Sequence, residues 1–162
     1  MRLTRAGEYG VRCVLFLAGR GQGVLCARRE IAAAMDIPDQ FLGKIAQQLA
    51  RAGLVEIVQG ARGGIRLAVP PGEVTLLEVV EAVIGEIFLN DCLMRADACN
   101  RSSACAVHHV WDRARIQLRQ TLGEATFAGI LAATSCIAPQ APPQRKTARP
   151  PRTAKPQRKG AR

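Results

Sequence analysis

Two short helical patterns separated by a tight break constrain the fold of this chain more than any other feature. Apolar residues recur at helical spacing over residues 28–35 and 39–52, and Asp36-Ile37-Pro38 ends the first pattern and starts the second. An earlier helical pattern begins after Thr4, a residue type that caps helix N-termini, and ends at Gly19. Three helices in this order, the last two joined by a short turn, predict a helix-turn-helix core.

The helix expected over residues 39–52 has one apolar and one polar face. Phe41, Leu42, Ile45 and Leu49 form the apolar stripe. The polar face carries amides and cations without an acid, whereas a solvated surface helix, the alternative for this segment, normally mixes in Glu or Asp. We therefore predict that the polar face enters a DNA major groove. The predicted contacts are Gln40, Lys44, Gln47, Gln48 and Arg51.

A hairpin pattern follows this helix directly. Residues 54–58 and 65–69 alternate as strands around the glycine-rich turn at residues 59–64. The glycines allow the backbone to approach a duplex closely, so that Arg62 could enter the minor groove or bind phosphate. An ordinary glycine-rich turn with an incidental arginine is the alternative. The predicted fold is mainly α with a small β-hairpin wing, a winged helix-turn-helix.

More helices are expected after the wing. Thr75 and Glu78 form a capping box that opens one helix, a long helix covers about residues 105–122, and a short helix restarts at Thr126. Too little chain follows the long helix to cover its apolar face. We expect that face to pack against a second copy, giving a homodimer, with packing inside one subunit as the alternative. The face comprises Val107, Val110, Trp111, Ala114 and Leu118.

The positive charge of the chain is concentrated at its end. The formal net charge is +10, but eight Lys or Arg residues and no acid lie from residue 139 onward. That Pro- and Arg-rich composition cannot bury enough apolar surface to order itself. We divide the chain into a DNA-binding domain (1–72), a linker helix, cysteine loop and dimerisation helix (73–134), and a basic tail (135–162) that either solubilises the protein or adds non-specific DNA contacts.

Several classes of protein do not fit this chain. No apolar run approaches the ~18 residues of a membrane span, and no signal peptide opens the chain. We therefore expect a cytoplasmic protein without a membrane partner, in a compartment that keeps thiols reduced. With no phosphate-binding loop, no readable nucleophile and base, and only two histidines, we expect neither an enzyme nor a small-molecule substrate.

Three cysteines and a histidine cluster in one polar segment: Cys92, Cys99, Cys105 and His108. Converging thiolates suit zinc or an iron-sulfur cluster. The gaps of six and five residues lack the tight pair typical of structural zinc, which favours a cluster. Zinc, unliganded thiols, and a disulfide with one thiol left over are the alternatives. We assign the remaining cysteines, Cys13, Cys26 and Cys136, to structure.

Several motifs along residues 1–132 occur in a specific order. They are Tyr9-Gly10-Val11-Arg12, LARAGLV at 49–55, GARGGIRLA at 60–68, TLLEVVEAV at 75–83, and the three cysteines. Together they resemble the Rrf2 family of bacterial transcription regulators. The resemblance implies a dimeric DNA-binding protein, more often a repressor than an activator. It also implies an iron-sulfur cluster, 2Fe-2S favoured over 4Fe-4S, that senses cluster status, iron, redox state or nitric oxide.

The same resemblance implies one cluster per subunit on Cys92, Cys99 and Cys105. IscR-like members complete the shell with a histidine after the third cysteine, here His108, whereas NsrR-like members use an acid in the first helix of the partner, here Glu8. Gly43 stands where relatives often carry Glu, so a different operator is expected. A zinc-stabilised or cofactor-free winged-helix factor and, more remotely, a cluster-transfer scaffold are the other readings.

Overall fold

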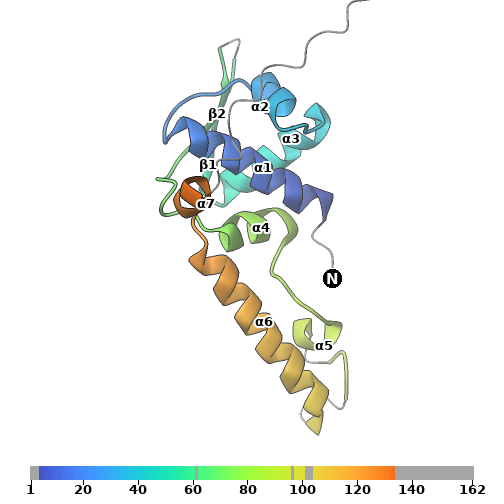
Figure 1. Cartoon of the computed structure of the whole chain (residues 1–162). Coiled ribbons are helices and arrows are strands. Elements are labelled where there is room, and N and C mark those ends of the chain that lie inside the picture. Colours follow the sequence, from blue (N-terminus) through green and yellow to red (C-terminus); the bar gives the residue numbers. More distant parts are fainter. Residues whose placement is uncertain (1–3, 61, 96, 101–103, 134–162) are drawn as a thin grey trace, which may run out of the picture.

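A computed structural model describes residues 4–60, 62–95, 97–100 and 104–133 of the chain. Figure 1 shows a helical body with a β-hairpin at one end and a long helix that extends away from it. The elements in chain order are α1 (Arg5–Arg20), α2 (Arg28–Ala34), α3 (Asp39–Arg51), β1 (Val55–Val58), β2 (Gly64–Leu67), α4 (Leu76–Ile84), α5 (Asp91–Met94), α6 (Ala106–Glu124) and α7 (Phe127–Ala133). The predicted fold class, mainly α with a β-hairpin wing, is confirmed.

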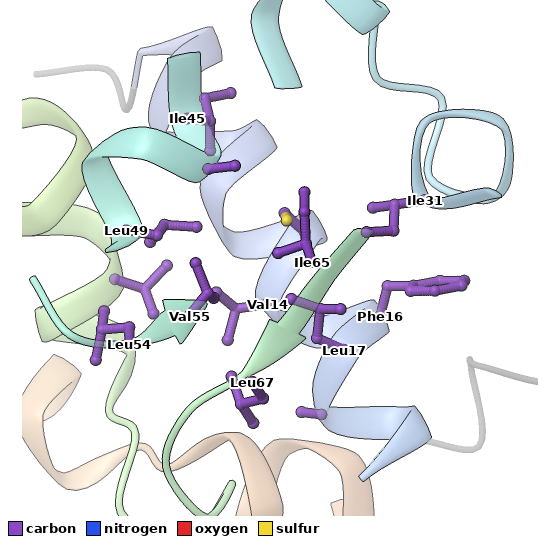
Figure 2. Close-up of a cluster of buried hydrophobic side chains, with 14 of the residues drawn as sticks. Val14, Phe16, Leu17, Ile31, Ile45, Leu49, Leu54, Val55, Ile65 and Leu67 are labelled. Carbon is purple, nitrogen blue, oxygen red and sulfur yellow. The ribbon is translucent and has the colours of Figure 1, made fainter. Parts of the chain in front are cut away.

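Helix α1 is the centre of the core. Thr4 caps it as predicted, because its hydroxyl oxygen accepts a hydrogen bond from the Gly7 amide at 3.2 Å. Side chains from α2, α3 and the wing converge on α1 (Figure 2), and burial of their apolar surface stabilises the body. The labelled residues of this cluster are Val14, Phe16, Leu17, Ile31, Ile45, Leu49, Leu54, Val55, Ile65 and Leu67.

The wing is attached to the body by a third backbone segment that the sequence did not reveal. Strands β1 and β2 pair antiparallel, with Val55 opposite Leu67. Cys26 exchanges two backbone hydrogen bonds of 2.9 Å with Ile65 on the other edge of β2. Cys26 therefore extends the sheet and does not cap α2, whose N-cap is Ala27. A Cβ on Gly64 would lie only 2.3 Å from the Cys26 carbonyl oxygen, which explains the glycine at this position.

Helix α7 returns to the body and completes its core. Phe127 is fully buried, and its amide donates to the Val74 carbonyl at 2.9 Å. The Leu76 amide donates to the Ala125 carbonyl at 2.8 Å, which ties the start of α4 to the end of α6. In Figure 1 α7 lies against α1. Residues before and after position 72, the end of the first region defined from the sequence, therefore belong to one hydrophobic core. The predicted tail, residues 135–162, lies outside the described residues.

Helix α6 extends from the body as an arm, with α5 beside its distal part (Figure 1). Val107, Val110 and Trp111 are 59%, 53% and 41% exposed, and α6 contributes no residue to the core. Three residues of the predicted apolar face are therefore left uncovered by the described part of the subunit, while Ala114 and Leu118 of the same face are half-buried. None of the helices that the structure describes is long and apolar enough to cross a membrane.

Candidate DNA-binding face and metal-binding segment

Helix α3 presents one polar stripe to solvent. Gln40, Lys44, Gln47 and Arg51 are exposed, and their spacings of four, three and four residues place them on one face of the helix. The opposite side is buried in the core through Leu42, Ile45, Ala46 and Leu49. Four of the five predicted contacts on this helix therefore share one accessible surface.

Phe41 does not lie on the buried side of α3, contrary to the expectation from the sequence. Its side chain is 45% exposed, and its ring contacts Tyr9 of α1 with 6.0 Å between ring centroids. Ala46, which the sequence did not place in the stripe, is buried. Phe41 lies at the edge of the buried face, where its ring packs on Tyr9 and stays partly in solvent.

Gln48, the fifth predicted contact on α3, is placed differently. Its side chain is half-buried, and its amide nitrogen donates a hydrogen bond of 2.9 Å to the Val83 carbonyl oxygen in the last turn of α4. The donor is thus already engaged within the subunit, unlike the side chains of the exposed stripe.

A groove of about 350 Å³ separates α3 from the wing. Arg28, Gly43, Gln47 and Gly60 are among the residues that line it. Arg28 forms a two-point ion pair with Asp39, with its Nε and Nη2 at 2.9 and 2.6 Å from the carboxylate oxygens. The pair connects the first turns of α2 and α3 and orients the groove wall.

Sequence reasoning missed the role of Arg28. The available signal was an arginine in the first turn of one helix and an acid in the first turn of the next, but a salt bridge between them requires the two helices to be placed first.

The cations of this face differ in whether they are paired. Within the described part of the chain, Lys44, Arg51 and Arg62 have no ion-pair partner. Arg66 is paired across the strands with Glu56, with 2.7 Å between Nε and the carboxylate oxygen. The unpaired cations on α3 and at the wing tip are therefore the ones available to phosphate. Ala61, which precedes Arg62 in the predicted turn, lies outside the described residues.

The predicted cluster ligands lie on α5, in the loop that follows it, and at the start of α6. Cys92 is half-buried on α5, Cys99 is exposed, and Cys105 is half-buried at the N-cap of α6. They are not gathered here: among the described residues, no three His, Cys, Asp or Glu side chains lie close enough together to hold a metal ion. Glu8, the alternative ligand from a partner subunit, is exposed on α1.

His108 carries an unsatisfied donor or acceptor. Its Nδ1 is buried and has no hydrogen-bond partner among the residues the structure describes. Buried polar atoms of this kind are rare in folded proteins and call for an explanation such as an absent ion. By chemistry alone, three thiols and an imidazole nitrogen in one segment form a donor set that suits zinc or an iron-sulfur cluster.

The two cysteines of the body have a different character. Burial, and secondarily the neighbouring Cys26, raises the pKa of the Cys13 thiol to about 12. Burial and the Glu30 carboxylate raise the pKa of Cys26, partly offset by Arg20. Because metals bind thiolates, thiols kept neutral in this way are poor ligands, in line with the structural role expected for them. Cys136 lies outside the described residues.

Comparison with known proteins gives a consistent family. Residues 3–133 match the Rrf2 family, described as "Iron-dependent Transcriptional regulator". Protein aau3 of Rhizobium meliloti (strain 1021) is 38% identical over 109 residues, which cover 67% of this chain and 70% of that protein. The HTH-type transcriptional regulator NsrR of Shouchella clausii (strain KSM-K16) is 32% identical over 132 residues, covering 81% of this chain and 89% of that protein.

A solved structure shares the fold. T. potens IscR superposes with a TM-score of 0.65 at 23% sequence identity, covering 87% of this chain and 94% of that one. The family description and the name of the NsrR relative denote regulators of transcription and not enzymes, which agrees with the prediction made from the sequence. The chain therefore belongs to the Rrf2 family of DNA-binding transcriptional regulators.

Proposed function

We propose that this protein is a homodimeric repressor whose affinity for its operator is controlled by an iron-sulfur cluster. The observation that carries the proposal is the position of the cysteine segment. It lies between α4, which packs on the proposed recognition helix α3, and α6, where the described residues leave Val107, Val110 and Trp111 exposed. A change in that segment acts on both neighbours. A regulator of this kind works beside the bacterial chromosome, so we place it in the cytoplasm.

DNA binding is assigned to the exposed stripe of α3 and to the wing. Gln40, Lys44 and Gln47 face a major groove, where amides and amines can contact base edges or phosphates. Arg51 and Arg62 contact the backbone or the minor groove. The absence of an ion-pair partner for these cations in the described part of the chain supports this assignment.

Dimerisation is assigned to α6. A helix face with Val107, Val110 and Trp111 each more than 40% exposed is unfavourable in water unless another surface covers it. A second copy of the same helix covers it and generates two-fold symmetry, which places two α3 helices on successive turns of one face of the duplex.

The cluster is assigned to Cys92, Cys99 and Cys105, with His108 or the Glu8 of a partner as the fourth ligand. Thiolates bind iron strongly, and a nitrogen or oxygen donor gives a weaker, proton-dependent bond where acid, oxidant or nitric oxide can act. The bound group supplies redox and nitrosylation chemistry. The three sulfur atoms must converge to bind the cluster, and 2Fe-2S is favoured over 4Fe-4S.

A cofactor-free regulator is the second candidate, and one observation favours it. Among the described residues, no three His, Cys, Asp or Glu side chains lie close enough together to hold a metal ion. In that case Cys92, Cys99 and Cys105 would be ordinary thiols or a disulfide with one thiol left over.

Purification of the full chain without oxygen distinguishes the candidates. We expect a coloured protein whose iron and sulfide contents are close to stoichiometric and whose affinity for operator DNA changes when the cluster is removed. A colourless, iron-free protein with equal DNA affinity before and after oxidation would support the cofactor-free regulator. Stoichiometric zinc would indicate a structural metal site.

Lys44→Ala is expected to weaken binding to operator duplex about tenfold and to lower the salt slope of log K by about one per subunit. The reason is the loss of an unpaired cation from the centre of the exposed stripe. Fluorescence anisotropy at several salt concentrations measures both quantities. Arg113→Ala is the matched control, because it removes the same charge from exposed α6. Unchanged affinity and slope in Lys44→Ala would remove this residue from the contact surface.

A further inference from the structure

The last turn of α4 is one of the places where α3, the proposed recognition helix, contacts the rest of the molecule. The final carbonyls of a helix have no N–H partner within it. For Val83 the partner comes from α3, because the Gln48 amide donates to this carbonyl at 2.9 Å. On the side of α1, a Cβ at Gly10 would lie 2.8 Å from a Val83 methyl, so these helices are in close contact. The last turn of α4 is therefore in direct contact with both α3 and α1.

The same turn is also tied to the α6 arm. The Glu81 carboxylate accepts a hydrogen bond from the Ile87 amide at 2.9 Å and pairs with Arg119 of α6. Glu86 lies 3.1 Å from Arg115 and 3.5 Å from Arg119. A carboxylate in the last turn of α4 and one just after it thus bind two guanidinium groups of α6. Glu86 is exposed, and the other three side chains are half-buried.

The cysteine segment is linked to α6 one turn further along. In the amide orientation that satisfies both of its groups, Asn90 accepts a hydrogen bond of 2.9 Å from the Trp111 indole nitrogen and donates one of 2.8 Å to the Leu89 carbonyl. Asn90 is the N-cap of α5, the helix that carries Cys92. Phe88, in the same linker, lies under the Arg115 guanidinium at 5.4 Å.

We infer that Gln48 is a positioning residue that couples the recognition helix to the α6 arm and the cysteine segment, and that it makes no contact with DNA. The contacts run from Asn90, at the start of the helix that carries Cys92, through Trp111 to α6. They continue from α6 through Arg119 and Glu81 to α4, and from Val83 to Gln48. This inference rests on the proposed DNA-binding function, and it adds the route by which the two ends of the molecule affect each other.

The coupling must operate in both directions. If the state of the arm changes the free energy of DNA binding, then DNA binding changes the arm to the same extent. Trp111 is the only tryptophan in the chain and lies on the arm, so its emission reports this effect without any cluster. The hydrogen bond from Gln48 can be removed at nearly constant volume by Gln48→Met, which leaves the Val83 carbonyl without its donor.

The experiment titrates the full chain with an operator duplex selected by the protein from a random library, following duplex anisotropy and Trp111 emission in parallel. For the wild type we expect saturating duplex to shift the emission. Gln48→Met should bind the duplex but lose most of the shift. The neighbouring Gln47→Met, on the exposed stripe, should bind about tenfold more weakly and keep the full shift at saturation.

Three results would overturn the inference: no emission shift in wild type that binds DNA, a full shift in Gln48→Met at saturation, or a loss of affinity in Gln48→Met equal to that in Gln47→Met. Arg119→Met provides a second test should Gln48→Met fail to fold, because it breaks the same route between α4 and α6 and must also reduce the shift. A wild type that binds no duplex refutes the proposed function itself, which is a separate outcome.

Discussion

Cys99→Ala, purified without oxygen, is expected to contain almost no iron or sulfide, whereas the wild type contains both. Cys99 is one of three thiols in a segment that otherwise offers only a nitrogen or oxygen donor. Two thiolates and one weak donor hold a cluster far less firmly than three thiolates do. Iron and sulfide assays and the visible absorption spectrum measure the loss. Operator affinity in this variant should no longer respond to oxidant or nitric oxide.

Cys136→Ala is the control for this experiment, since it removes a thiol outside the proposed ligand set. It should retain the iron, sulfide and colour of the wild type. Cys99→Ala with wild-type iron content would exclude Cys99 as a ligand. If the wild type and both variants lack iron and bind the operator with the same affinity, the cluster proposal fails while the DNA-binding assignment remains.

Phe127→Ala is expected to destabilise the protein by about 3–5 kcal/mol, as large-to-small changes of buried aromatic residues do. Phe127 has no exposed surface and lies in the same cluster as the α1 and wing residues. A loss of this size is a large part of the roughly 5–15 kcal/mol that stabilises a typical domain. Urea denaturation followed by circular dichroism gives the free energy of unfolding.

Ile116→Ala is the matched control, because Ile116 is 52% exposed on α6 and its loss should cost less than about 0.5 kcal/mol. A cost for Phe127→Ala as small as that of the control would mean that α7 does not belong to the core. The protein would then unfold in two steps, with the C-terminal segment separating from the winged helix first.

Features that depend on neighbouring residues in the chain were predicted well. Thr4 caps α1, and Thr75 and Glu78 form the reciprocal capping box at the start of α4. Helix α3 and the wing lie within a few residues of the expected bounds. These features could be read from the sequence because a cap, a helical stripe or a hairpin turn is defined by residues at most a few positions apart.

Features that depend on distant residues were not predicted. Cys26 pairs with Ile65, and Phe127 enters the core of the first helices. Nothing near Cys26 in the sequence marks it as part of a sheet, because an isolated bridge leaves no alternating pattern. The short α5 was also missed, since its four residues are too few to show helical periodicity.

The sequence by itself determined the winged helix-turn-helix, the family, and the set of side chains from which DNA contacts and ligands are drawn. Only the tertiary structure decided which of them are available. Gln47 and Gln48 are adjacent residues of one helix, but only Gln47 is exposed. The side chain of Gln48 points toward α4 and donates a hydrogen bond to the Val83 carbonyl, whereas that of Gln47 points into solvent. Periodicity places residues on a helix face, but burial and hydrogen bonding depend on what packs against that face.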